Sequence, residues 1–134
     1  MKKHLLRISM LAALAVSASQ AETYYATMPF SFVVGNKTAP AGEYVIDPSA
    51  GSDVVIIKSA NHKEGFAVMG TNVTSADYPR ASRLVFHRYG NRYFLAEIWT
   101  RGSDAGRRIQ ASPEERELLA QGKIHRTQTT VALR

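Results

Sequence analysis

The stretch LVFHRYGNRYFLAEIWT, which runs from Leu84 to Thr100, contains the clearest signal for secondary structure in this chain. Two runs rich in apolar and aromatic residues flank the dipeptide Gly90-Asn91. A two-residue loop with Gly at its first position is typical of a type II′ turn, which joins neighbouring antiparallel strands. The stretch therefore predicts a β-hairpin.

The same loop predicts the register of the hairpin, because side chains alternate between the two faces along each strand. Counting outward from the loop pairs Tyr89 with Arg92, His87 with Phe94 and Phe86 with Leu95. We expect Glu97 on one face beside Leu84, and His87 on the other face beside Ile98. Both faces are substantially apolar, which is typical of strands covered on both sides.

Strand-like patterns occupy most of the remaining chain. Residues 30–34 place Phe30, Phe32 and Val34 at alternate positions between smaller or polar neighbours. Residues 54–57 form a β-branched run, and residues 43–47 and 66–73 add two further runs. Segments dense in Gly, Pro, Asn and Ser separate these runs. The Thr-rich segment 124–133 is a further candidate strand.

One helix is predicted near the C-terminus. Ser112 supplies an N-cap, Pro113 suits the first helical position, Glu115 completes a capping box, and Gly122 is a natural stop. We therefore expect a mainly β fold, either an antiparallel β-sandwich or a small partly open barrel, with one short C-terminal helix.

The first residues, MKKHLLRISMLAALAVSASQA, have the three parts of a secretory signal: a basic start, a short apolar run and a small-x-small end at Ala21. The apolar run is shorter than the about 20 residues that a membrane-spanning helix needs. We expect residues 1–21 to be a cleaved signal peptide and 22–134 to be one β-rich domain without a transmembrane segment. A Sec-type signal predicts export to the periplasm, the cell surface or the medium.

Charge and composition exclude several classes of function. Of the 17 Lys and Arg residues, Lys2, Lys3 and Arg7 belong to the signal, so 14 face 11 Asp and Glu residues in the domain. This small excess gives no support to nucleic-acid binding. The chain has no Cys, which removes thiol catalysis and thiolate metal sites. The histidines lack the spacing of a metal pair, so we predict no metal and no cofactor.

No catalytic residue is assigned from the sequence. Sequence signatures of serine hydrolases and of nucleotide-binding loops are absent. Glu97 and His87 are the best candidates for a small carbohydrate-active enzyme or another hydrolase, and this activity is the alternative function. The register places Leu84 opposite Glu97, with Arg83 or Arg88 near enough to pair with it, which favours a structural ion pair.

Two groups of residues are candidates for binding. Arg101, Arg107 and Arg108 lie in the Gly-containing segment 100–108, where guanidinium groups would capture an anionic envelope polymer. Tyr89 and Trp99 would supply an aromatic sheet surface for a protein partner. The simpler interpretation of the arginine segment is a solvated loop.

Two motifs connect the chain to other proteins. MPFSFVVGNKTAPAGEYVI, Met28 to Ile46, fits the pattern PFxFxVGxxxxPAGxYxI, and YFLAEIW, Tyr93 to Trp99, ends the hairpin. Together they resemble a group of small, exported, β-rich bacterial proteins of unknown function. The resemblance implies export and a β-rich fold and carries no catalytic residue. The function expected is an exported, non-enzymatic binding or envelope-associated protein.

Overall fold

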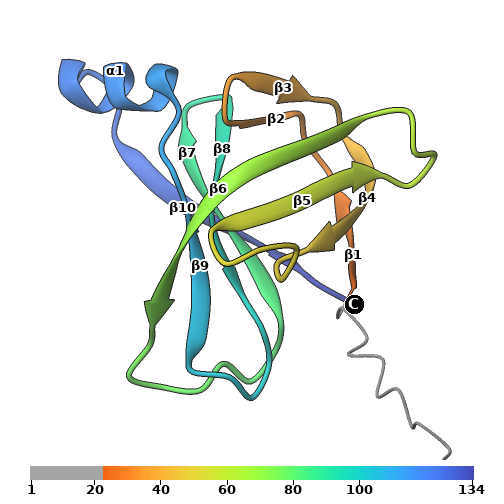
Figure 1. Cartoon of the computed structure of the whole chain (residues 1–134). Coiled ribbons are helices and arrows are strands. Elements are labelled where there is room, and N and C mark those ends of the chain that lie inside the picture. Colours follow the sequence, from red (N-terminus) through yellow and green to blue (C-terminus); the bar gives the residue numbers. More distant parts are fainter. Residues whose placement is uncertain (1–22) are drawn as a thin grey trace, which may run out of the picture.

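The computed structural model describes residues 23–134 (Figure 1). The predicted signal peptide, residues 1–21, lies outside the described residues. The described part contains ten strands and one helix: β1 (Tyr24–Met28), β2 (Phe32–Val34), β3 (Lys37–Ala39), β4 (Gly42–Asp47), β5 (Val54–Ser59), β6 (Gly65–Thr74), β7 (Arg83–Tyr89), β8 (Arg92–Trp99), β9 (Ala105–Ile109), α1 (Pro113–Gln121) and β10 (Arg126–Ala132). The predictions of a mainly β fold and of one short C-terminal helix are confirmed.

The strands form one large sheet that curls around a core without closing into a barrel (Figure 1). The order β1-β4-β5-β6-β9-β8 continues to β7 and then β10. The β2–β3 hairpin joins the sheet where β2 runs parallel to β8, so the sheet is mixed. Its two ends approach each other where Tyr25 and Arg134 exchange backbone hydrogen bonds of 3.0 and 2.9 Å.

The interior of the curled sheet is filled by one main apolar cluster. Phe32 lies at its centre, in edge contact with the rings of Tyr44 and Phe86 at centroid distances of 5.2 and 5.6 Å. The PAG segment of the first motif secures this centre, because the Tyr44 hydroxyl donates a hydrogen bond of 2.5 Å to the carbonyl oxygen of Pro40. The motif Met28 to Ile46 is therefore explained by packing.

The hairpin turn has the predicted type. Gly90 has φ of +59°, and among the described residues other than glycine only His62 has a positive φ, so Asn91 does not. A positive φ at the first loop residue alone is the signature of a type II′ turn. The predicted pairs nearest the loop, including His87 with Phe94 and Phe86 with Leu95, are also confirmed.

Beyond Leu95 the predicted register is wrong, because β8 contains a β-bulge. Phe86 pairs with Leu95 but Val85 pairs with Glu97, which leaves Ala96 as an extra residue on β8. An extra residue reverses the alternation of the side chains that follow it. Ile98 therefore enters the core beside Leu84, and Glu97 lies on the outer face with His87.

The segment 100–108 is only partly the loop that the sequence predicts. Residues 105–109 form β9, which lies between β6 and β8. The guanidinium group of Arg107 bridges this region to the β4–β5 loop, because it donates hydrogen bonds to the carbonyl oxygens of Gly51 (3.0 Å), Ser52 and Gly70 (3.3 Å). Pairing with two neighbouring strands outweighs the weak strand propensity of Ala105 and Gly106.

Helix α1 has the predicted caps and lies on the outside of the sheet. Ser112 Oγ accepts a hydrogen bond of 3.1 Å from the Glu115 backbone N–H, and Gly122 ends the helix with φ of +64°. Leu118 packs on a second, smaller cluster made by Val33, Tyr89 and Phe94. This contact holds the first turns of α1 against the outer face of β7 and β8.

Candidate functional site

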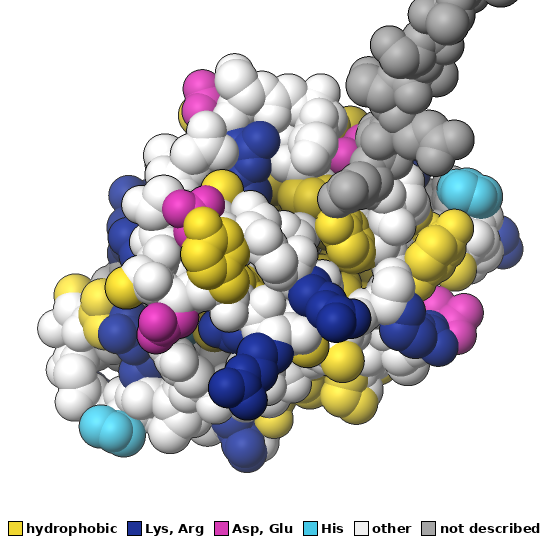
Figure 2. Space-filling model, turned by 90° about the horizontal axis from the view of Figure 1, so that it is seen from below, with side chains coloured by type: hydrophobic (Ala, Val, Ile, Leu, Met, Phe, Trp, Pro, Cys, Tyr) yellow, Lys and Arg dark blue, Asp and Glu magenta, His cyan; other side chains and the backbone are white. Residues whose placement is uncertain are grey.

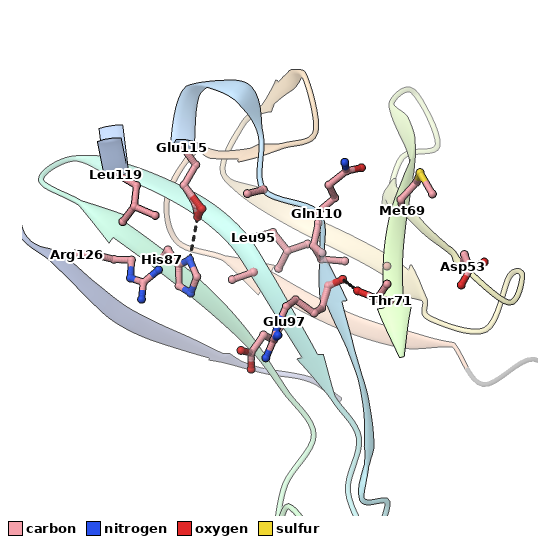
Figure 3. A pocket seen from close by; sticks show the side chains of 15 residues that line it. Asp53, Met69, Thr71, His87, Leu95, Glu97, Gln110, Glu115, Leu119 and Arg126 are labelled. Atoms are coloured by element: carbon pink, nitrogen blue, oxygen red, sulfur yellow. Dashed lines mark hydrogen bonds and ion pairs between the residues drawn. The ribbon is translucent and has the colours of Figure 1, made fainter. Parts of the chain in front are cut away.

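A pocket of about 570 Å³ lies between α1 and the outer face of the sheet (Figure 3). Strands β6, β7, β8 and β9 and the linker before α1 all contribute residues to its wall. His87, Glu115 and Arg126 lie together on one side of the view, and Met69 and Thr71 lie on the other. His87, Glu115 and Arg126 thus form the charged end of the pocket, with Leu119 beside them, whereas Asp53 and Gln110 accompany Met69 on the other side.

A hydrogen-bonded contact between His87 and Glu115 forms part of the charged end. His87 Nδ1 lies 2.9 Å from Glu115 Oε1, and the two side chains are 17% and 7% exposed. Glu115 occupies the third position of α1, so its backbone N–H completes the cap while its carboxylate reaches across to β7. The positive end of the helix dipole favours a negative charge at this position. The second nitrogen of His87 points away from Glu115 (Figure 3).

The bulge in β8 brings Glu97 into the same pocket. The Trp99 indole N–H donates a hydrogen bond of 2.7 Å to Glu97 Oε2, and Arg108 lies directly opposite Glu97 on β9. Charges of opposite sign attract each other when they face each other directly across two paired strands. The predicted pairing of Glu97 with Arg88 is wrong, because Arg88 donates to the Gly90 carbonyl oxygen at 2.8 Å. The other predicted neighbour, Arg83, pairs with Trp99 in the register.

Tyr89 contributes a buried hydroxyl group beside the charged end. The residue is 1% exposed, and its hydroxyl oxygen has no hydrogen-bond partner among the described residues. Burial raises the pKa of Tyr89, and the nearby Glu115 carboxylate raises it further, whereas the Arg126 side chain lowers it both as a close hydrogen-bonding neighbour and through its positive charge. Arg126 is the residue directly opposite Tyr89 on β10. Both charges therefore lie close to this hydroxyl group.

The three arginines predicted to bind an anionic polymer point to different places. Arg101 is exposed in the β8–β9 loop, Arg107 is bonded to backbone carbonyl groups, and Arg108 lines the pocket. The two predicted aromatic residues are largely covered, since Tyr89 is 1% and Trp99 7% exposed. Their roles in binding stay predictions.

Arginine side chains also gather at the end of the sheet opposite to α1. Figure 2 shows this lower face, where dark blue Lys and Arg side chains lie among exposed apolar side chains. The loops that precede β7 and β9 meet here, because Gly102 N–H bonds to the Pro79 carbonyl oxygen at 3.1 Å and Arg101 N–H to Ser82 Oγ at 2.9 Å. This contact brings the exposed residues Arg80 and Arg101 to the same end.

Two residues of the pocket escaped the sequence analysis. The sequence around Glu115 predicts a helix cap, and the residue does take part in that cap. Its contact with His87 in the pocket has no separate signal in the sequence. Arg126 lies at the start of a strand that the sequence predicted only weakly. Neither residue is near His87 in the chain, so no local spacing connects them. Arg126 comes close through the pairing of β10 with β7, and Glu115 through the position of α1 on the sheet.

Within residues 23–134, no group of three or more His, Asp or Glu side chains is placed to hold a metal ion. No helix in the same range is long and apolar enough to cross a membrane. Comparison with protein-family models, with curated proteins and with solved structures finds no match to this chain.

Proposed function

We propose that the protein is an exported, non-enzymatic binding protein whose ligand lies in the pocket between α1 and the sheet. The observation that carries this proposal is that Arg126, a charged residue that lines the pocket, has no oppositely charged partner among residues 23–134. Glu115 contacts His87, and Glu97 accepts the Trp99 N–H, while Arg126 makes no ion pair within residues 23–134. A concave, mostly apolar site with a few convergent polar groups is the usual form of a small-molecule site.

The size of the pocket and the predicted export of the protein support the same proposal. The volume of about 570 Å³ is typical of pockets that hold a small organic ligand. The secretory signal predicted at residues 1–21 and the resemblance to small exported bacterial proteins support a role outside the cytoplasm.

The first prediction tests whether the pocket binds at all. The dye 1-anilinonaphthalene-8-sulfonate, an apolar ring system with one anionic group, is expected to bind saturably and to fluoresce. Ala111→Trp, which fills the pocket from its exposed linker wall, is expected to weaken dye binding about tenfold, a loss of about 1.4 kcal/mol. The control is Ala120→Trp, an equally exposed change on α1 outside the pocket. Equal affinity in the two variants would contradict the proposal.

Envelope association is the second part of the proposal, and the lower face supports it. Exposed arginines near an anionic polymer attract it, and salt screens this attraction over about 10 Å at 0.1 M ionic strength. Residues 22–134 are expected to co-sediment with isolated cell envelope at low salt and to dissociate at high salt. Arg80→Gln with Arg101→Gln is expected to reduce binding more than Arg88→Gln at the opposite end. Binding that resists salt would instead indicate an apolar contact or a protein partner.

One observation favours the alternative, a small hydrolase that uses Glu97 and His87. The bulge places both residues in one pocket, and Glu115 orients His87 as a carboxylate orients the imidazole of many general bases. If the alternative is correct, aryl glycosides or esters are turned over by the protein, and His87→Gln abolishes turnover while dye binding persists. Absence of turnover leaves the binding proposal in place.

A further inference from the structure

The curled sheet is open between β3 and β6. Strand β8 pairs with β9 from Glu97 to Trp99, but at Phe94 the β2–β3 hairpin takes the place of β9. In the same half of the sheet, Gly65 to Met69 of β6 pair with β5 alone among the described strands. Strand β3 likewise pairs with β2 alone among them. The free edges of β6 and β3 therefore lie on the two sides of one opening (Figure 1).

Two adjoining cavities of about 430 and 460 Å³ lie along this opening, and together they form the β3–β6 groove. Lys37 and Phe66 line both cavities, and the Lys37 ammonium group lies 5.5 Å from the centre of the Phe66 ring. The linker before α1 bounds one end, where the Gln110 N–H donates a hydrogen bond of 3.1 Å to the Met69 carbonyl oxygen. The turn before β6, with Lys63, bounds the other end.

The β6 wall of the groove offers backbone groups that the β5 ladder does not use. The Ser59 N–H donates a hydrogen bond of 2.9 Å to the Glu64 carbonyl oxygen. At the other end of the β5–β6 pair, the Gly70 N–H donates one of 2.9 Å to the Asp53 carbonyl oxygen. Hydrogen-bonded positions alternate along an antiparallel pair, so the even-numbered residues of β6 face β5. The N–H and C=O of Ala67 consequently point away from β5 and into the groove.

The β3 wall offers the same kind of groups. Val34 pairs with Lys37 across the two-residue loop Gly35-Asn36, so these two residues form the pair that closes the hairpin. The next residue, Thr38, then directs its N–H and C=O away from β2, and it lines the groove. A single extended peptide would find hydrogen-bonding partners on both walls. The edge of a whole sheet in a second copy of this chain would instead collide with one wall.

The β6 edge lacks the features that prevent strand pairing. Exposed edges are usually protected by charged residues, by Pro or by a β-bulge. The stretch GFAVM, Gly65 to Met69, contains no charged residue and no Pro, and its register with β5 is regular. Phe66 belongs to the main apolar cluster and Val68 packs against it, so an added strand would lie over an apolar floor.

Charge around the groove indicates which peptide fits. Lys37, Lys63 and Arg116 line it, against the one acidic residue Glu64. Side chains alternate along a strand, so every second side chain of an added peptide faces the floor and the others face outward. We propose that the β3–β6 groove binds an extended segment of a protein partner in which apolar and acidic residues alternate, added as a strand to the free edge of β6. This site lies beyond the pocket between α1 and the sheet.

A labelled hexapeptide in which valine alternates with glutamate, acetylated and amidated at its ends, tests the proposal by fluorescence anisotropy. It is expected to bind saturably and at least about tenfold more tightly than the same peptide with lysine in place of glutamate. Methylation of alternate backbone nitrogens, which removes the donors along one edge of the peptide, is expected to weaken binding by a similar factor. In the complex the Ala67 amide is expected to exchange with solvent more slowly. The Asn72 amide, which faces away from β9 on the other edge of β6, is expected to be unaffected.

Two pairs of variants identify the groove as the binding site. Ala67→Pro removes an N–H that points into the groove and takes none from the β5 ladder, so at least about tenfold weaker binding is expected. Asn72→Pro is the matched control on the same strand.

The second pair leaves the backbone of β6 intact. Lys37→Glu with Lys63→Glu, both at exposed positions, is expected to weaken binding of the valine–glutamate peptide at least about tenfold. Arg80→Glu with Lys123→Glu makes the same change in net charge at exposed positions outside the groove and is expected to have a much smaller effect.

Several results would overturn the proposal. Equal affinity for the glutamate and lysine peptides would remove the acidic partner, and an Ala67 amide that exchanges equally fast in the complex would place the peptide elsewhere. A dimer whose Ala67 amide is protected without any peptide would assign the groove to a second copy of this chain. None of the substituted residues lines the pocket between α1 and the sheet, so the dye experiment on that pocket succeeds or fails independently.

Discussion

Gly106→Ala is expected to destabilise the domain by about 3 kcal/mol, near the upper end of what overpacking a core costs. A Cβ atom at Gly106 would lie 2.5 Å from Trp99 Cε3 and 2.6 Å from Cζ3. The indole ring covers this glycine directly across the β8–β9 pair, and its N–H is held by Glu97 at 2.7 Å. The ring cannot move aside without breaking that hydrogen bond.

The melting temperature measures this effect, and a loss of about 3 kcal/mol corresponds to a fall of about 10–15 °C for a domain of this size. The sequence contains a single Trp, so intrinsic fluorescence reports on Trp99 alone and is expected to change in the folded variant. Gly65→Ala is the control, because its Cβ would meet only the Lys58 Cγ at 3.7 Å, an ordinary contact. Similar melting temperatures for the two variants would refute the close packing of Trp99 on Gly106.

Local signals in the sequence were sufficient for the parts of the fold that local chemistry determines. The Gly90-Asn91 loop fixes its own turn type, and Ser112-Pro113 with Gly122 fixes both ends of α1. Each of these signals acts through backbone groups a few residues away, so no tertiary contact is needed to interpret it.

The pocket was not predictable because it depends on a bulge and on long-range pairing. A single extra residue, Ala96, moves Glu97 from the expected face beside Leu84 to the outer face. Periodicity along β8 cannot reveal the insertion, since Ala, Ile and Trp suit either face. Arg126 reaches Tyr89 only through the β7–β10 pair, although the two residues lie 37 positions apart in the chain.

The same limitation explains the interpretation of the arginines. The sequence groups Arg101, Arg107 and Arg108 because they are neighbours in the chain. Strand alternation then sends Arg107 and Arg108 to opposite faces of β9, where one is bonded to carbonyl groups and the other lines the pocket. Proximity in sequence was thus a poor guide to a shared surface.

The second large effect is expected at the buried His87–Glu115 pair. His87→Leu is expected to cost about 2–3 kcal/mol, because it leaves a carboxylate that is 7% exposed without its partner. Glu115→Met is expected to cost less, about 1 kcal/mol, since the remaining imidazole can be neutral. Combining both changes removes the unpaired charge, so the double variant is expected to be more stable than the sum of the single losses by about 1–2 kcal/mol.

Urea denaturation at neutral pH measures the three variants against the parent protein. The adjacent pair Arg92–Glu114 is the matched comparison, because it joins the same turn of α1 to the same hairpin at 2.5 Å but is 46% and 45% exposed. Exposed pairs contribute about 0–1 kcal/mol, so Arg92→Leu is expected to have a small effect. If the losses at His87 and Glu115 simply add, the pair does not couple α1 to β7. A coupling energy between His87 and Glu115 that exceeds the loss in Arg92→Leu would attribute the strength of the contact to the burial of Glu115. Its position in the first turn of α1 would then not be the cause, because Glu114 lies in the same turn.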